Sequence, residues 1–444
     1  MNELILEKIK QAGVAGAGGA GFPTHVKIAC EAEYVIVNCA ECEPLIQSDK
    51  YLMEQHGAKI VEGLQAVKDC TGAKYGVLAV KYKNKAAVKA LESAVSGKEG
   101  VSLHLLENYY PAGDEQQIIY EVTGRVIPVG KLPIEAGCVV VNAQTAYHVA
   151  EAMESSPVIR RNVTITGEVH SPLTVTAPIG TSIAYLLDLA GGVTCEDYTV
   201  IIGGPLMGRA AADVKAEFVT KTTNGVIVLP ANHELVRKKT SSLEQELKVA
   251  KAACCQCNYC TLVCPRSSLG LGVQPHKVMQ ALTFSNAGVL VDGNAALGCC
   301  NCGLCTYVGC NMGLSPSRFI SRMRTELLAK KIKASREPGP VNLFREDTKV
   351  PSKRVIQRTG LADYDREVPY VASYDAPRAV RIMLKQHIGV PCEANVSEGD
   401  MVREGQCIGQ IPEGALGANV HASISGRVVT VSKDYIDIME AYPA

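Results

Sequence analysis

Two similar cysteine runs organise the chain: CCQCNYCTLVCP at residues 254–265 and CCNCGLCTYVGC at residues 299–310. Their spacings are C-x2-C-x2-C-x3-C, followed by Pro265, and C-x2-C-x2-C-x4-C. Three thiolates on one tight loop can bind three corners of a cuboidal [4Fe–4S] cluster, while the fourth cysteine of each run reaches the other cluster. We therefore predict two [4Fe–4S] clusters. Their ligands are Cys254, Cys257, Cys260 and Cys310 for one, and Cys299, Cys302, Cys305 and Cys264 for the other.

Zinc and disulfides are the alternatives for so many cysteines. C-x2-C pairs are typical of zinc sites, but those sites use two pairs of ligands rather than two runs of three with a distant fourth. Disulfides are disfavoured because the N-terminal sequence MNELILEKIKQAG is not a secretory signal. Cys255 and Cys300 each adjoin a predicted ligand, out of register. We interpret them as small buried residues and leave ligand exchange open.

The composition narrows the class of protein. The 444 residues suggest roughly three domains. Lys and Arg together number 45, as do Asp and Glu, so the net charge is zero and nothing favours nucleic acid as a partner. No apolar run approaches the ~18 residues that a membrane span needs. Eighteen cysteines without a signal sequence predict a reducing, cytoplasmic location.

A glycine-rich loop, GAGGAGFPTHVK at residues 16–27, follows a predicted helix at 3–12. Gly16, Gly18 and Gly21 match G-x-G-x-x-G, but a dinucleotide fingerprint should follow a strand, so the Rossmann interpretation fails in this context. Glycines without a Cβ still let backbone N–H groups approach a phosphate closely. A helix that begins near Thr24 is expected to add its positive end, and Lys27 could reach the same anion.

Strands and helices alternate over the next 120 residues. We predict strands at 34–38, 75–81, 101–107 and 138–142, with helices at 50–70 and 84–95 and further helices near 115 and after 145. This alternation predicts a parallel α/β sheet. Asn38, Glu41 and Glu43 follow the first strand, where polar side chains suit a ligand at the carboxyl end of the sheet, although a solvated loop explains them equally well.

Four motifs together resemble one family. GAGGAGFPTHVK, YVIVNCAECEP (34–44), YYPAGDE (109–115) and VVVNAQT (139–145) are similar to the loops that hold FMN and NADH in the flavoprotein subunit of respiratory complex I and in RnfC-type electron-transfer subunits. The resemblance implies FMN binding by Gly16, Gly18, Gly19, Lys27, Asn38, Glu41, Tyr110, Gly113, Asp114, Asn142 and Thr145. It implies that Phe22, Glu43 and Glu115 lie near NADH.

The chain departs from the complex I pattern at several positions. Ala17 stands where that pattern has Arg, Ala40 where it has Asp, and Val141 where it has the first of two Asn residues. Cys42 replaces a Ser, and we interpret its C-x2-C pairing with Cys39 as incidental packing. These departures affect flavin affinity and the choice of nucleotide more than the existence of the site.

Five segments are predicted: residues 1–158 as the FMN- and NADH-binding α/β domain, 159–235 as a β-grasp domain, 236–334 as an α-helical two-cluster domain, 335–377 as a linker packed over the others, and 378–444 as a barrel-sandwich hybrid. The second resembles the soluble-ligand-binding β-grasp (SLBB) domain and is expected to be a spacer, although its 203–208 glycine loop leaves a ligand site open. In the helical domain His276 is expected at the surface or in a helix cap.

The C-terminal segment resembles biotinyl and lipoyl carriers, but GANV at 417–420 lacks the attachment Lys, so it is expected to be structural. RnfC-type subunits carry this sandwich at the front of the chain, and here it stands at the back. Order and motifs together resemble the cobalamin reductases of propanediol-utilisation microcompartments. That resemblance implies an NADH-dependent oxidoreductase that passes electrons through FMN and two [4Fe–4S] clusters to cob(III)alamin or cob(II)alamin.

The same resemblance implies partners and a location. The expected partners are NADH, cobalamin or a cobalamin-handling enzyme such as an adenosyltransferase, and microcompartment shell proteins, with residence inside a bacterial microcompartment. Two rival hypotheses stay open. One is an electron conduit to a ferredoxin or reductase, docked on a basic helix at 318–333. The other is a scaffold with vestigial cofactors, which the eight intact ligand cysteines disfavour.

Overall fold

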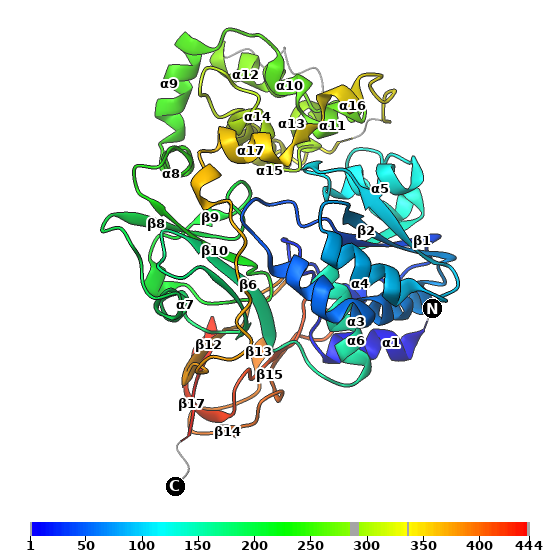
Figure 1. Cartoon of the computed structure of the whole chain (residues 1–444), viewed down its shortest axis with the longest axis vertical. Helices are drawn as coiled ribbons and strands as arrows, with labels where there is room; N and C mark the ends of the chain where they lie inside the picture. Colours follow the sequence, from blue (N-terminus) through cyan, green and yellow to red (C-terminus); the bar gives the residue numbers. More distant parts are fainter. Residues whose placement is uncertain (1, 285–292, 335–336, 442–444) are drawn as a thin grey trace.

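The structure, a computed structural model, describes residues 2–284, 293–334 and 337–441. The predicted segments 236–334, 335–377 and 378–444 include stretches 285–292, 335–336 and 442–444, which lie outside the described residues. Figure 1 shows the cysteine-rich helices at the top, the first α/β unit at the right, a second sheet at the left and the C-terminal strands at the bottom.

A four-stranded parallel sheet forms the first α/β unit. Its strands are β1 (Tyr34–Cys39), β2 (Tyr75–Lys81), β3 (Val101–Leu106) and β5 (Cys138–Asn142), in the order β3-β2-β1-β5. Parallel sheets are covered on both faces, which explains the near-continuous apolar sequences of β1, β2 and β5. The predicted parallel α/β sheet is therefore confirmed.

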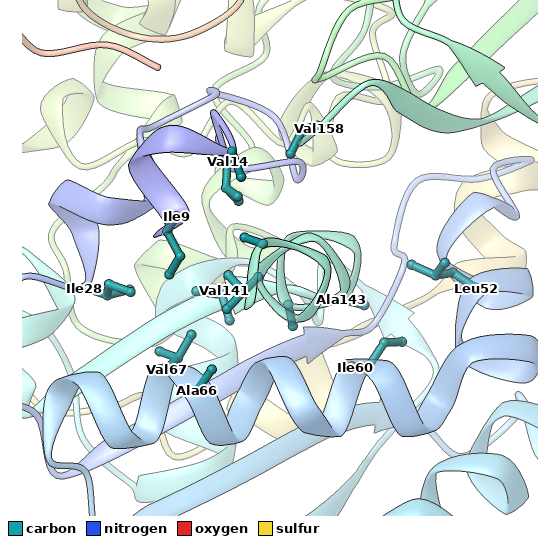
Figure 2. Close-up of a cluster of buried hydrophobic side chains, with 14 of the residues drawn as sticks. Ile9, Val14, Ile28, Leu52, Ile60, Ala66, Val67, Val141, Ala143 and Val158 are labelled. Carbon is teal, nitrogen blue, oxygen red and sulfur yellow. The ribbon is translucent and has the colours of Figure 1, made fainter. Parts of the chain in front are cut away.

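Helices cover both faces of this sheet. α1 (Glu3–Gln11), α3 (Ser48–Thr71), α4 (Lys85–Val95) and α6 (Ala143–Met153) pack on one face, and α5 (Glu115–Thr123) packs on the other. Because successive side chains of a strand point to opposite faces, Val35 and Val37 meet α3, while Ile36 meets α5. Figure 2 shows Ile60 and Val67 of α3 turned toward the side of the sheet that carries Val141.

The strand order places a crevice between β1 and β5. The chain moves from β1 outward through β2 to β3 and then returns to the opposite side of β1 with β5. At such a reversal the loops leave the carboxyl ends of neighbouring strands in opposite directions, and open α/β sheets bind ligands there. Asn38 and Asn142 end these two strands and are register partners.

A five-stranded mixed sheet follows. It contains β6 (Arg160–Gly167), β7 (Leu173–Pro178), β8 (Tyr198–Ile202), β9 (Arg209–Ala210) and β10 (Gly225–Pro230), in the order β7-β6-β10-β8-β9. α7 (Ile183–Leu189) packs its apolar side against this sheet. One helix on a small mixed sheet matches the predicted β-grasp architecture.

The cysteine-rich region is helical, as predicted. Its elements are α8 (Glu234–Thr240), α9 (Leu243–Ala253), α10 (Tyr259–Leu262), α11 (Pro265–Ser268), α12 (Pro275–Thr283), α13 (Asn294–Leu297), α14 (Leu304–Tyr307) and α15 (Pro316–Ala329). Val278, Met279, Phe319 and Ile320 form a core between α12 and α15. The short helices and their loops carry the cysteines around this core.

Residues 337–377 run as a strap from the helical domain past the β-grasp sheet to the C-terminal strands (Figure 1). The strap contains α16 (Arg345–Thr348), β11 (Val350–Pro351) and α17 (Ser352–Arg358), and β11 pairs with β4 (Tyr109–Tyr110). Arg345 is buried and pairs with Glu121 of α5 at 2.6 Å. The strap is thus packed against the first α/β unit.

Two small antiparallel sheets form the C-terminal sandwich. One contains β12 (Ala379–Met383), β18 (Tyr435–Met439), β17 (Gly426–Val431) and β14 (Met401–Val402); the other contains β13 (Glu393–Ala394), β15 (Cys407–Gln410) and β16 (Val420–His421). Ile382, Ile408 and Val428 are buried in a core that continues into the first α/β unit. Across the described residues, no helix is both long enough and apolar enough to cross a bilayer.

Candidate functional site

A cleft of about 370 Å³ opens at the carboxyl ends of β1 and β5. Every residue that the resemblance assigned to FMN or NADH lines it: Gly16, Gly18, Gly19, Phe22, Lys27, Asn38, Glu41, Glu43, Tyr110, Gly113, Asp114, Glu115, Asn142 and Thr145. Four loops that are distant in the sequence therefore meet at one place. That the ligands are bound through these side chains stays a prediction.

The glycine-rich loop forms one wall of the cleft. Its ends are joined by a bridge between Ala15 and Pro23 and by the N–H of Gly16, which donates to the carbonyl of Phe22 at 2.9 Å. Within the described residues, the N–H groups of Gly18, Gly19 and Ala20 donate to no protein acceptor, and all three residues are exposed. A run of free N–H groups beside a cleft fits the phosphate of a flavin nucleotide.

The helix expected after the loop is only one turn long. α2 begins at Thr24, as predicted, but covers only Thr24–Lys27, which is too short for a substantial helix dipole. The 11-residue α6 begins at the cleft instead, capped by the side chain of Asn142. Thr145 in its first turn accepts the N–H of Ala17 at 2.9 Å, which fixes the glycine loop over this helix.

Two asparagines at the strand ends hold the loops of the cleft. Asn38 donates from Nδ2 to the carbonyl of Gly113 at 2.8 Å and accepts the N–H of Ala40. Asn142 donates from Nδ2 to Oδ2 of Asp49 at 2.6 Å. The two amides therefore position neighbouring segments of the cleft.

Two carboxyl groups, the partly exposed Glu41 and the buried Asp49, line the cleft. Glu41 has a φ of +35° and accepts the N–H groups of Asp49 and Lys50 at the start of α3. Burial is the main cause that raises the pKa of Glu41 to about 8, and the negative charge of the nearby Asp49 adds to the effect. Burial also raises the pKa of Asp49, whose Oδ1 is buried and has no partner among the described residues. This unpaired oxygen at the cleft wall fits a hydroxyl donor such as those of a ribityl chain.

Two ion pairs connect the cleft to its surroundings. Lys27 pairs with Glu115 at 3.1 Å across the mouth of the cleft. Asp114 receives two hydrogen bonds from Arg266, from Nε at 2.8 Å and from Nη2 at 2.6 Å. Arg266 follows Cys264 and Pro265, so this bidentate pair attaches the cleft directly to the cysteine-rich domain.

Tyr110 joins the cleft to the second cysteine run. Its hydroxyl lies 2.7 Å from Oε1 of Glu43 and 2.9 Å from the carbonyl oxygen of Cys302. One hydroxyl has one proton, so both contacts are hydrogen bonds only when Glu43 is protonated and donates to Tyr110. Burial raises the pKa of Glu43, which favours that state.

The cysteines lie around two hollows. The first is lined by Cys254, Cys257, Cys260 and Cys310, and the second by Cys264, Cys299, Cys302 and Cys305. Cys310 thus lies with the first three cysteines and Cys264 with the second three; that these eight bind the clusters stays a prediction. Among the described residues, no three Cys, His, Asp or Glu side chains are arranged around one point as for a single metal ion.

The donor set suits a positively charged centre. Burial raises the pKa of Cys260 to about 12 and raises the pKa of Cys264 and Cys305 as well. Metals bind the thiolate, so these buried groups ionise only beside positive charge of the kind that cluster iron provides.

Two neighbours of the ligands differ from expectation. Cys255 is exposed, not buried, although it lines the first hollow together with the predicted ligands. Cys300 is partly exposed and lines both the second hollow and the cleft. His276 is partly exposed, lines the first hollow and is hydrogen-bonded to Thr261 through Nδ1 at 2.7 Å.

The β-grasp domain also contributes to the cleft. Met207 and Asn224 line it, and the N–H of Leu206 donates to Oε2 of Glu43 at 2.8 Å. A Cβ on Gly204 would lie 2.1 Å from that oxygen, so this loop needs glycine. The domain is therefore more than the expected spacer. In the sequence, only the glycines at 203–208 indicated that this domain contributes to the cleft. Nothing in the sequence indicated that Asp49 lines it.

Family models match in the order of these domains. The Nuo51 FMN-binding domain matches residues 9–151, the SLBB domain 162–210, the 4Fe-4S dicluster domain 253–315 and the RnfC barrel sandwich hybrid domain 366–442. Fold and matched domains together define a multidomain flavin and iron–sulfur electron-transfer protein, with FMN and two [4Fe–4S] clusters as its cofactors.

Curated relatives narrow this class. The chain is 42% identical over 439 residues to "Cobalamin reductase PduS" of Salmonella typhimurium, covering 98% of this chain and 96% of the relative. It is 38% identical over 441 residues to the protein of the same name from Citrobacter freundii, with the same coverage. The chain belongs to the PduS cobalamin reductase family.

Two more distant matches cover a smaller share of this chain. One component of the Na(+)-translocating ferredoxin:NAD(+) oxidoreductase complex of Acetobacterium woodii is 34% identical over 272 residues, 59% of this chain and 58% of the relative. A crystal structure of NAD+-reducing [NiFe]-hydrogenase in the H2-reduced state is 18% identical with a TM-score of 0.48, covering 76% of this chain and 63% of that chain.

Proposed function

We propose that this protein is an NADH-dependent oxidoreductase that reduces cob(III)alamin or cob(II)alamin. FMN held in the cleft would supply the chemistry that links a two-electron hydride donor such as NADH to one-electron acceptors such as the clusters. The glycine loop, with Lys27, binds the flavin phosphate, and Asn38, Asn142 and Thr145 hold the loops around the ring. Phe22, Glu43 and Glu115 lie on the side that NADH enters.

One observation carries this proposal: the cleft and the second cysteine hollow share a wall. Cys300 and Cys302 line both, and Tyr110 at the cleft lies within hydrogen-bond distance of the Cys302 carbonyl. The first hollow is farther from the cleft than the second hollow, and its Cys257 is exposed. The order cleft, buried cluster, exposed cluster supports electron flow from NADH inward and then out to an acceptor.

The proposals for the electron acceptor and the partner proteins rest on membership of this family. The two relatives are named cobalamin reductases, which supports cobalamin as the acceptor. We further propose that a cobalamin-handling enzyme such as an adenosyltransferase receives the reduced cobalamin, and that the protein works in the cytoplasm inside a microcompartment beside shell proteins.

The test is an anaerobic titration. FMN, iron and sulfide are quantified, NADH is added while flavin and cluster absorbance are followed, and cob(III)alamin is then added. Bleaching of both chromophores followed by cobalamin reduction is expected. Bleaching without cobalamin turnover would move the function to a conduit for a partner protein, and a preparation with zinc and no flavin would overturn both.

The arginines of the basic helix give the conduit hypothesis little support. On α15, Arg318 pairs with Glu246 at 2.6 Å and Arg322 with Glu326 at 3.0 Å, while Arg324 donates to the carbonyl of Cys299. These arginines are largely used within the chain, which leaves them less able to attract an acidic partner.

A further inference from the structure

A second cavity, of about 480 Å³, lies on the other side of the segment that follows β1. Residues 41–47 form the partition, since Glu41, Cys42, Glu43 and Ile46 line both this cavity and the cleft. Its other walls come from the carboxyl end of β2, from α17 and from residues 365–367 of the strap. Its size is within the range of small-molecule sites, and the proposed electron path does not use it.

Lys81 points to a ligand in this cavity. It is the last residue of β2, its exposed fraction is 1%, and it lines the cavity. Within the described residues its ammonium has no hydrogen-bond or ion-pair partner. An unpaired ammonium with so little access to solvent is stabilised by an anion, so Lys81 favours an anionic group in the cavity that it lines.

A second unpaired group faces the same space. The hydroxyl oxygen of Ser352, at the start of α17, is buried and has no partner in the described part of the chain. Lys83 and Lys85 line the cavity nearer the solvent. Desolvation, and then repulsion by the ammonium of Lys81, lower the pKa of Lys83, which places two like charges close together.

Most of the carboxylates in the lining are already engaged. Glu41 accepts the N–H groups of Asp49 and Lys50, and Glu43 accepts that of Leu206. Glu367 pairs with Lys50 at 3.0 Å. Glu54 completes the lining, together with an exposed Asp365 at the rim. The side chains with unused hydrogen-bond donors at the buried end are therefore Lys81 and Ser352.

We propose that this cavity binds the phosphate group of a small ligand, with Lys81 and Ser352 as its buried donors and Lys83 as a further cation. Lysine binds phosphate as a point charge, and a phosphate has enough acceptor oxygens for all three groups. Leu45, Ile46 and Ile356 give the remaining wall an apolar surface for the rest of the molecule. The phosphate belongs either to the nicotinamide dinucleotide of the adjoining cleft or to a separate phosphorylated compound.

The test uses the full-length, FMN-loaded protein and inorganic pyrophosphate as the probe, with binding measured by calorimetry and thermal unfolding. Pyrophosphate is expected to bind and to raise the Tm of the wild type, because a ligand of the native state stabilises it. In Lys81→Met the unpaired ammonium is gone. This variant is expected to have a higher Tm without the probe, at least tenfold weaker binding and little rise in Tm with the probe.

Two further variants test whether the loss of binding is specific to residues of the cavity. Lys98→Met removes an exposed lysine outside the cavity and should bind like the wild type. Ser352→Ala removes only a hydroxyl and should bind several-fold more weakly, which provides a test if Lys81→Met does not fold. Absence of pyrophosphate binding at millimolar concentration, or equal binding by the wild type and both cavity variants, would overturn the proposal.

A competition measurement identifies the source of the phosphate. If pyrophosphate raises the NADH concentration needed for half-bleaching of the flavin in the wild type but not in Lys81→Met, the phosphate is that of the dinucleotide. If the NADH dependence is unchanged while pyrophosphate is bound, the site takes a separate phosphorylated ligand. Either result is independent of whether cobalamin is the acceptor.

Discussion

Arg161 of the β-grasp domain holds the glycine loop of the flavin domain from behind: its Nη2 donates to the carbonyl oxygen of Ala17 at 2.9 Å. The same guanidinium donates from Nε to the carbonyl of Thr223, also at 2.9 Å. Lys221 acts in the same way on Gly13, whose carbonyl accepts its Nζ at 2.6 Å. These buried cations turn loop carbonyls away from the cleft, which leaves N–H groups free at its surface.

Replacement of Arg161 should therefore weaken FMN binding without touching the cleft. In Arg161→Met, two buried carbonyls lose their donors, at a cost of about 1–3 kcal/mol for each unsatisfied group. We expect FMN affinity to fall about tenfold or more, measured by flavin fluorescence quenching with deflavinated protein. The control is Arg160→Met, which removes a neighbouring arginine that pairs at the surface with Glu404. Equal affinities in the two variants would contradict the positioning role.

Tyr110→Phe should separate reduction of the flavin from reduction of the clusters. The change removes the hydroxyl between Glu43 and the Cys302 carbonyl and leaves both groups buried with one partner fewer. We expect stopped-flow bleaching of the flavin by NADH to stay close to wild type, while cluster bleaching slows several-fold. The free energy of unfolding should fall by about 1–3 kcal/mol. Unchanged cluster reduction would show that this contact has no part in the electron path.

The two cysteine groups should be separable by single substitutions. Cys257→Ser is expected to lose the cluster of the first hollow and Cys302→Ser that of the second, each lowering bound iron to about half. NADH should still reduce the remaining cluster in Cys257→Ser but only slowly in Cys302→Ser, because the second hollow adjoins the cleft.

The matched control for these variants is Cys255→Ser, since Cys255 is exposed and out of register. Its iron and sulfide content and its electron paramagnetic resonance spectrum should equal those of the wild type. Loss of iron in Cys255→Ser, or full iron in Cys257→Ser, would show that the ligand set is shifted by a residue.

Glu41 should make stability depend on pH. Its pKa is raised from 4.5 to about 8, so between these values the native state keeps a proton that the unfolded state releases. The stabilisation is complete below the unfolded value and is lost as the pH rises through about 8. In flavin-free protein the free energy of unfolding should fall more steeply from pH 5 to 8 in the wild type than in Glu41→Gln, by on the order of 1 kcal/mol per pH unit. Parallel curves would rule out a buried proton on this group.

Local patterns in the sequence were sufficient for much of the fold. Val35, Val37 and their neighbours are apolar on both faces of a strand, so the buried parallel sheet follows from the sequence. The single turn of α2 and the exposure of Cys255 could not be predicted, because both depend on how the loop is packed rather than on its residue types.

The sequence by itself determined the cofactor chemistry: cysteine spacing fixes which thiolates one loop can present to a cluster, and glycine positions fix where backbone can approach a phosphate. Only the tertiary structure decided that Arg161 and Lys221 hold loops of the flavin domain from behind, and that the strap helps to enclose Lys81 in a second cavity. The physical reason is that spacing acts within a few residues of chain, whereas burial of a charge depends on which distant segments cover it.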